Sequence, residues 1–173
     1  MQRIIAFIMS VIMLIGSLLP ALPGSQINGV KTGDWLTMVV EEFNMEDEEF
    51  SETPSTNVTA ESPYFAAVQI AYKWGVIVDE DVPLAIDEFI TTEFVATTLV
   101  RIAGLELNDA TPISNAKKLA NPAEVATAVD LGLFKLDFLK RFNVKKITLE
   151  DAKAALAKVK ELWATRTFGA PVA

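Results

Sequence analysis

VQIAYKWG (residues 68–75) and ITTE (90–93) decide the fold of this chain, because the same pattern returns 57 positions later as VATAVDLG (125–132) and ITLE (147–150). In both copies, 15 positions separate the final glycine of the first segment from the isoleucine that opens the second. A repeat of this length indicates supersecondary units that bury their apolar faces only against one another. The repeat therefore predicts an architecture before it predicts a function.

Each copy reads as a helix, a loop and a second helix, because its apolar residues recur at helical spacing. Ser62-Pro63 and Asn121-Pro122 mark helix starts, and Gly75 and Gly132 suit the left-handed residue that ends a helix. Thr91 and Thr148 are the predicted N-caps of the second helices. The expected helices cover residues 63–74, 92–103, 122–131 and 149–163.

Residues 32–43 repeat only the second helix of the pattern. Aligned by their acids, Asp34 and Trp35 correspond to Glu93 and Phe94. The chain is therefore predicted to be all-α, with two complete helix-loop-helix units and one half unit.

The N-terminus has the layout of a secretory signal peptide. Arg3 precedes an almost wholly apolar run, residues 4–19, which Pro20, Pro23 and Gly24 then interrupt. Cleavage between Gly24 and Ser25 is expected. A retained signal-anchor is the alternative, because the run approaches the ~20 residues that span a bilayer.

The remaining segments follow from composition. Residues 46–60 are rich in acids, Ser, Thr and Pro, which is typical of an exposed linker. A calcium site is the alternative there, but the ligand spacing and central glycine of an EF-hand loop are absent. The predicted organisation is a signal peptide (1–24), a half unit (25–45), an acidic linker (46–60), two full units (61–107 and 108–163) and a flexible tail (164–173).

The chain contains no cysteine and no histidine. This excludes disulfides, thiolate metal sites and cysteine nucleophiles, and it removes the commonest general bases and zinc ligands. The composition therefore predicts a protein that is not an enzyme and that uses no cofactor and no metal ion.

Charge is unevenly distributed along the sequence. Residues 25–109 hold 3 basic and 17 acidic residues, whereas residues 110–160 hold 10 basic and 5 acidic ones. Several of the basic residues fall in or beside the last inter-helix loop: Lys135, Lys140, Arg141, Lys145 and Lys146. This loop is either a contact for an anionic polymer or a solvated face that balances the acidic half.

A helix that ends in a single glycine, a loop of about 14 residues, and Ile-Thr-x-Glu at the start of a second helix resemble the S-layer homology (SLH) domain. The likeness covers most of residues 30–160. It implies three helical units packed as a pseudo-threefold bundle. It also implies non-covalent attachment to secondary cell-wall polysaccharide, or a polymer linked to peptidoglycan, at the surface of a bacterial cell.

In the SLH family the second helix opens with Thr-Arg-Ala-Glu, and the arginine is a main ligand contact because guanidinium binds a carboxylate through two parallel donors. Here Gly33, Thr92 and Leu149 stand at that position. The chain thus keeps the spacing of the family without its principal ligand group.

The candidate ligand-binding residues are acids at the starts of the second helices, aromatic side chains that could pack against sugar rings, and loop cations that could replace the arginine. Helix capping and core packing are the alternative roles of the acids and the aromatic residues. The candidates are Asp34, Glu93, Glu150, Trp35, Trp74, Lys140, Arg141 and Lys145.

Three functions follow as hypotheses. The first is an exported, non-enzymatic module that attaches to wall polysaccharide or is organised at the envelope. The second is a degenerate scaffold that binds other envelope proteins without binding polymer. The third is a glycosidase using Glu93 and Glu150 as paired carboxylates. Nucleic acid is not an expected partner at a pI near 4.6, and a membrane is expected only through an uncleaved signal segment.

Overall fold

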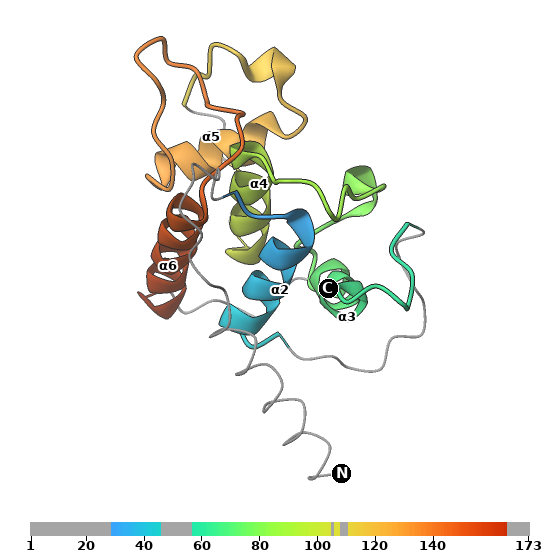
Figure 1. Cartoon of the computed structure of the whole chain (residues 1–173). Coiled ribbons are helices and arrows are strands. Elements are labelled where there is room, and N and C mark those ends of the chain that lie inside the picture. Colours follow the sequence, from blue (N-terminus) through green and yellow to red (C-terminus); the bar gives the residue numbers. More distant parts are fainter. Residues whose placement is uncertain (1–28, 46–56, 105, 108–110, 166–173) are drawn as a thin grey trace, which may run out of the picture.

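The computed structural model describes residues 29–45, 57–104, 106–107 and 111–165. These ranges contain five α-helices and two short 3-10 helices and no strand, so the predicted all-α class is confirmed. No helix among them is long and apolar enough to cross a membrane. The predicted signal peptide, most of the predicted acidic linker and most of the predicted tail lie outside these ranges. The elements are α2 (Thr32–Glu42), α3 (Phe65–Lys73), η1 (Asp79–Asp81), α4 (Thr92–Ile102), η2 (Ala116–Lys118), α5 (Pro122–Asp130) and α6 (Leu149–Thr165) (Figure 1).

Both predicted helix ends are present at the glycines. Gly75 follows α3 with φ +66° and Gly132 follows α5 with φ +67°. In the first, the N–H of Val76 donates to the carbonyl of Ala71 at 2.8 Å, and Leu133 makes the equivalent bond after α5. A glycine adopts this left-handed geometry without the steric cost that a Cβ would bring.

The helix starts follow the prediction less closely. Pro122 is the first residue of α5, as expected. α3 begins at Phe65, two residues after the expected start near Pro63, and the N–H of Phe65 donates to the carbonyl of Ser62 in the turn that precedes it. Thr91 does cap α4, since its hydroxyl accepts a hydrogen bond from the N–H of Phe94.

The segments that enter the three second helices meet one another through the backbone. Each segment pairs with one of the other two in a short antiparallel bridge, and the three bridges close a ring. The paired residues are Lys31 with Phe89, Thr91 with Lys146, and Thr148 with Gly29.

The ring encloses three apolar side chains. Val30, Ile90 and Ile147 are all buried. The N–H of Ile90 donates to the carbonyl of Val30 at 2.9 Å, and the N–H of Ile147 donates to the carbonyl of Ile90 at 3.4 Å. The Ile that opens each Ile-Thr-x-Glu motif is thus a core residue, and the half unit supplies Val30 in its place.

This ring corrects the alignment of the half unit by one residue. Lys31 occupies the place of Thr91 directly before its helix, so the half unit is displaced by 60 positions and not 59. Trp35 then corresponds to Val95, and both are fully buried. The alignment by sequence matched acid to acid, whereas the fold matches buried side chain to buried side chain. Asp34 is therefore not the equivalent of Glu93.

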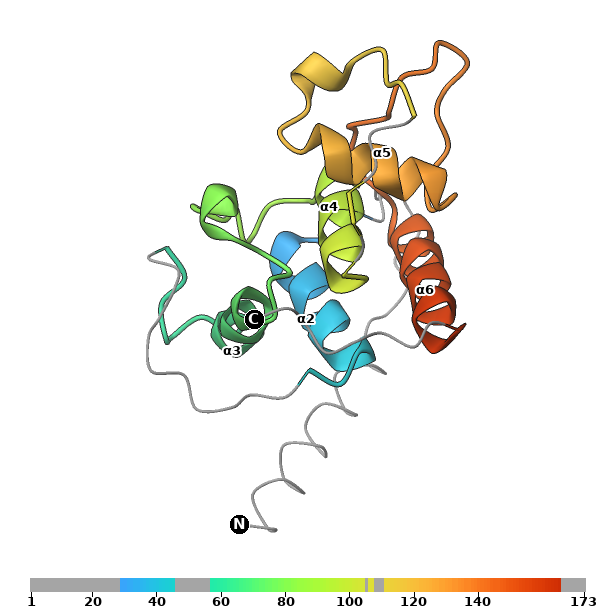
Figure 2. The ribbon, with the colours of Figure 1, turned by 180° about the vertical axis from the view of Figure 1, so that it is seen from behind.

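The closest helix pairs cross the boundaries of the sequence units. α2 packs against α3, and α4 packs against both α5 and α6 (Figures 1 and 2). The ends of α2 and α6 also meet, because the rings of Phe43 and Trp163 lie 4.9 Å apart and Lys160 pairs with Glu42. Each full unit therefore depends on the second helix of the unit before it.

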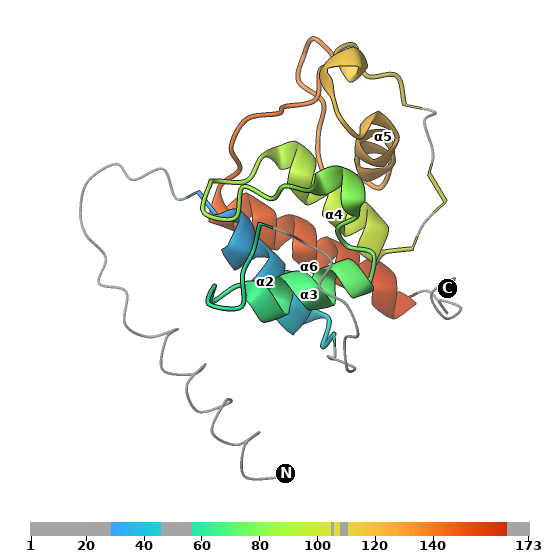
Figure 3. The ribbon, with the colours of Figure 1, turned by 90° about the vertical axis from the view of Figure 1, so that its right-hand side faces the viewer.

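Two apolar clusters fill the described part of the molecule. The larger lies among α2, α3, α4 and α6 and includes Trp35 and Leu99. The smaller joins α4 and α5 to the loops around them and includes Val100, Val125 and Phe142. Figure 3 shows α5 stacked beyond α4, on the side away from α2 and α3. The last unit is thus held on α4 by a cluster of its own.

Candidate functional site

Trp35 lies in the core and presents no face to a ligand. Its side chain is fully buried, and its indole N–H donates to the hydroxyl of Thr98 at 3.0 Å. Thr98 in turn donates back to the α4 backbone at Phe94 and Val95. Trp35 therefore ties α2 to α4, which is the packing alternative that the sequence left open.

Asp34 and Glu93 both bind the start of the following unit. Asp34 accepts a hydrogen bond from the hydroxyl of Tyr64 at 3.0 Å. Glu93 accepts bonds from the N–H groups of Ala120 and Asn121, at 2.7 and 3.1 Å, directly before α5. The carboxylate of Glu93 thus satisfies donors at a helix start, where negative charge is favourable. Glu150 is exposed on α6.

In the corrected alignment Thr32, and not Gly33, takes the position at which SLH domains carry arginine; the ring of Tyr64 covers Gly33, the next residue. A Cβ on Gly33 would lie 2.4 Å from Cγ of that ring. Partial burial and the bond to Asp34 raise the pKa of the Tyr64 hydroxyl. The half unit therefore has no room for a longer side chain at Gly33.

The remaining candidates are exposed. Trp74, directly after α3, is 41% exposed. Lys140 and Arg141 belong to the outer turn of the last inter-helix loop, and Lys145 contributes a backbone carbonyl that the hydroxyl of Thr92 binds at 2.9 Å. The structure does not gather the eight predicted residues into one site.

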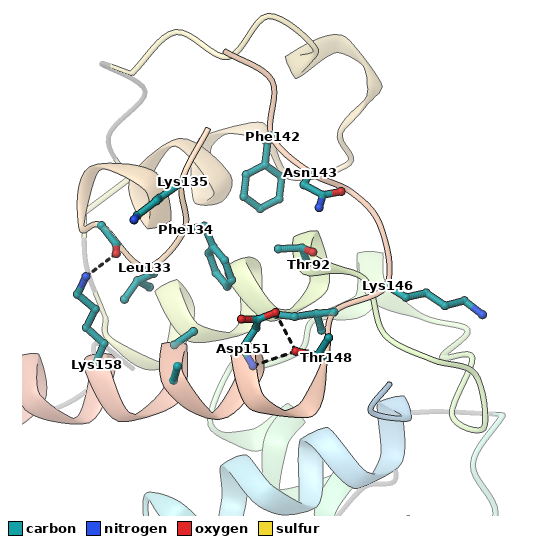
Figure 4. A pocket seen from close by; sticks show the side chains of 14 residues that line it. Thr92, Leu133, Phe134, Lys135, Phe142, Asn143, Lys146, Thr148, Asp151 and Lys158 are labelled. Carbon is teal, nitrogen blue, oxygen red and sulfur yellow. Dashed lines mark hydrogen bonds between the residues drawn. The ribbon is translucent and has the colours of Figure 1, made fainter. Parts of the chain in front are cut away.

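A different set of residues lines an open pocket of about 610 Å³ beside the last loop. Its walls come from the start of α4, the loop after α5 and the first three turns of α6 (Figure 4). The lining residues are Thr92, Gly132, Leu133, Phe134, Lys135, Phe142, Asn143, Lys146, Ile147, Thr148, Asp151, Ala154, Ala155 and Lys158.

The pocket combines an apolar wall with a few polar groups. The rings of Phe134 and Phe142 meet edge to face, with centroids 5.8 Å apart. Lys158 donates to the carbonyl of Gly132 across one side, as Figure 4 shows. The one carboxylate in the lining, Asp151, accepts a hydrogen bond from the hydroxyl of Thr148 at 2.8 Å.

The cations of the pocket are Lys135 and Lys158. Lys146 lines the pocket only with its stem, because its amino group lies 4.8 Å from the ring centroid of Phe89 and points away from the pocket (Figure 4). Two ammonium groups beside one hydrogen-bonded carboxylate favour an anionic ligand, and the apolar wall suits the carbon face of a sugar ring.

Sequence reasoning placed Lys135 and Lys146 in the basic loop but did not find Lys158 or Phe142. Lys158 lies 26 positions after Gly132, in a different element, and nothing in its local sequence marks it. Phe142 followed the cations Lys140 and Arg141, so its 2% exposure could not be read from its neighbours. Only the packing of α6 against the loop makes these residues neighbours.

A second polar cluster, which sequence analysis did not find, joins the two full units. The side chain of Arg101 is 14% exposed and pairs with Asp81 and Glu124. It also donates to the amide oxygen of Asn121 at 3.4 Å. Arg101 lies in the last turn of α4, Asp81 in η1 and Glu124 in the first turn of α5. The cluster is therefore a structural link between these packed elements rather than an open site.

No protein-family model matches the chain, and no curated protein matches its sequence. Within the ranges that the structure describes, no three acidic side chains gather to hold a metal ion.

Proposed function

We propose that this protein is an exported, non-enzymatic module of a bacterial envelope that binds an anionic wall polysaccharide through the pocket beside the last loop. The observation that carries the proposal is the pairing of Lys135 and Lys158 with the aromatic wall of Phe134 and Phe142. A polysaccharide with carboxylate substituents presents both charge and apolar sugar faces, which such a pocket can hold.

The position of Thr92 supports the proposal. Thr92 is aligned with the ligand-binding arginine of SLH domains, and it lines this pocket. The side chain of Thr92 is uncharged, and its hydroxyl already donates a hydrogen bond to the carbonyl of Lys145. Lys135 and Lys158 of the following unit would supply that charge from the opposite walls.

We further propose that the three second helices correspond to the pseudo-threefold bundle of SLH domains. In support, equivalent segments before α2, α4 and α6 pair in cyclic order, each through the same two positions. The described residues would then supply every helix of that bundle except the first helix of the first unit.

A hydrolytic role has little support. A two-carboxylate mechanism needs two acids that face one substrate. The pocket lining has Asp151 alone, and Glu93 already accepts two backbone hydrogen bonds. We therefore propose binding without catalysis.

The second candidate is a scaffold that binds other envelope proteins and no polymer. The presence of Thr32, Thr92 and Leu149 where SLH domains carry arginine favours it. The chain also has an acidic half, residues 25–109, and a basic half, residues 110–160. Attraction between the two halves would guide head-to-tail contacts. A monomeric sedimentation profile at low ionic strength, with no partner captured from an envelope extract, would exclude it.

The test is sedimentation of the purified protein with isolated cell-wall sacculi over a series of salt concentrations. Wild-type protein should sediment with sacculi and be released by salt. The double variant Lys135→Gln/Lys158→Gln should remain in the supernatant. Lys153→Gln is the matched control, because Lys153 is an exposed lysine of α6 outside the pocket. Equal sedimentation of all three proteins would refute the assignment of this pocket.

A further inference from the structure

The outer end of the last inter-helix loop is a tight, hydrogen-bonded turn. One carboxylate oxygen of Asp137 accepts bonds from the N–H groups of Leu139 and Arg141, both at 2.9 Å. The backbone of Asp137 also pairs with Arg141 and Lys140, at 2.9 and 2.8 Å. Lys140 takes the left-handed conformation that closes the turn, with φ +56°. The conformation of residues 137–141 is therefore fixed locally.

A second segment holds this turn in place from the side. The amide of Asn115 makes two hydrogen bonds, both of 3.0 Å, to the N–H and carbonyl of Phe142. Ser114 binds the carbonyls of Leu139 and Lys140 at 3.2 Å. Because Phe142 is anchored in the smaller core, the turn is connected to the body of the fold.

This turn, residues 137–141, presents the aromatic side chain of Phe138 to solvent. Phe138 is 92% exposed, and the adjacent Leu139 is 45% exposed. A phenylalanine held outward by a rigid turn leaves most of its apolar surface in water, which is unfavourable unless a partner covers it.

Four cations lie at the same end of the molecule as Phe138. Lys140 and Arg141 follow it in the turn, and Lys117 and Lys118 form η2 directly after the bracing residues; all four are exposed. Figures 1 and 2 show this loop and η2 at the same end of the molecule, beyond α5 and away from α3, with the loop at one corner and η2 at the other. These four cations outnumber the one acid of the turn, Asp137, so this end is basic although the whole chain carries a net charge of −8.

We propose that residues 137–141, together with Lys117 and Lys118, form a membrane-contact tip that inserts Phe138 into the interface of an anionic lipid bilayer. An aromatic residue with flanking cations suits that interface, because the ring reaches the apolar boundary while the cations pair with lipid phosphates. A polysaccharide would engage the cations and could cover one face of the Phe138 ring with a sugar ring, whereas insertion into the bilayer interface covers the whole side chain. The tip is separate from the pocket, and neither depends on the other.

The absence of cysteine allows a local test in the full chain, even if the N-terminal apolar segment also binds lipid. Phe138→Cys and Lys153→Cys are each labelled with a fluorophore that responds to polarity. The labelled proteins are mixed with vesicles of phosphatidylcholine alone or of phosphatidylcholine with phosphatidylglycerol. The emission from position 138 should shift to the blue, and quenchers in the lipid should reduce it, on the anionic vesicles only. The emission from position 153 should not change.

Unlabelled variants then test the residues themselves by vesicle flotation. Lys140→Gln/Arg141→Gln should lower partitioning onto anionic vesicles roughly 25-fold, because each cation contributes about fivefold. Phe138→Ser should lower it roughly tenfold and should leave sedimentation with sacculi unchanged. Because these side chains are exposed, thermal unfolding should match that of wild-type protein.

Three results would overturn the inference. They are equal emission shifts at positions 138 and 153, no shift on anionic vesicles, and a loss of sacculus binding in Lys140→Gln/Arg141→Gln without any effect of Phe138→Ser on vesicles. The last result would assign the cations to the wall polymer. Failure of the pocket variant Lys135→Gln/Lys158→Gln to affect sacculi would refute the proposed function while leaving this inference intact.

Discussion

Replacing Glu93 by Gln tests whether the acid of the Ile-Thr-x-Glu motif holds the fold together or binds a ligand. The carboxylate of Glu93 accepts hydrogen bonds from Ala120 and Asn121 at the start of α5. Glu150 has the equivalent place on α6 and is exposed. Glu150→Gln is therefore a matched control that removes the same charge from the first turn of a helix.

The magnitude follows from the two bonds. Each variant loses the interaction between an acid and its own helix dipole, which is worth about 0.3–1 kcal/mol. Glu93→Gln also exchanges a charged acceptor of two N–H groups for a neutral one, which costs about 1–2 kcal/mol more. At about 2–4 °C per kcal/mol for a domain of this size, Tm should fall by roughly 2–8 °C more in Glu93→Gln than in Glu150→Gln.

The assay is thermal unfolding by circular dichroism, with sacculus sedimentation measured on the same samples. We expect the Glu93 variant to be less stable and to bind sacculi as wild-type protein does at a temperature where it is folded. Equal Tm values for the two variants would refute the capping role. A loss of binding by Glu93→Gln without a change in Tm would show that the acid contacts the ligand.

Three further predictions concern the packing of the last unit and the starts of the helices. Phe142→Ala should destabilise the protein by about 3–5 kcal/mol, since it empties a buried site in the smaller core; urea unfolding measures this, and a change below 1 kcal/mol would contradict the packing. Arg101→Met should lower the free energy of unfolding by about 3–5 kcal/mol, because two nearly buried carboxylates lose their cation. The control Lys31→Met breaks an exposed pair with Asp87 and should change the free energy of unfolding by less than about 1 kcal/mol. The pKa of Tyr64 is raised in the folded state, so the contribution of its neutral hydroxyl to the free energy of unfolding is complete below the ordinary tyrosine pKa. That contribution is lost as the pH rises through the raised pKa. Tyr64→Phe should therefore flatten the alkaline fall of Tm, and an unchanged fall would contradict this.

The secondary structure of the full units was predictable from local sequence. Gly75 and Gly132 end their helices because left-handed backbone geometry excludes most other residues, and this constraint is visible in a single residue. The N-cap hydroxyl of Thr91 acts within four positions of its own helix. Such features need no distant partner, so they can be read from the chain alone.

The half unit was harder to place, for a definite reason. Sequence comparison paired Asp34 with Glu93, since acids are common at helix starts and were the most visible match. The fold instead pairs Trp35 with Val95, because both must fill the same kind of buried position. Burial depends on neighbours from other helices, and those neighbours are not adjacent in the sequence.

The sequence by itself determined a repeated all-α architecture, the ends of its helices, and a cationic loop in the last unit, because each depends on interactions within a few residues. Only the tertiary structure decided which cations line the same pocket. It brought Lys158 of α6 to Lys135, left Lys140 and Arg141 on an outer turn with Phe138, and enclosed Trp35 in the core. The physical reason is that a pocket or an exposed tip is defined by the packing of segments that lie far apart along the chain.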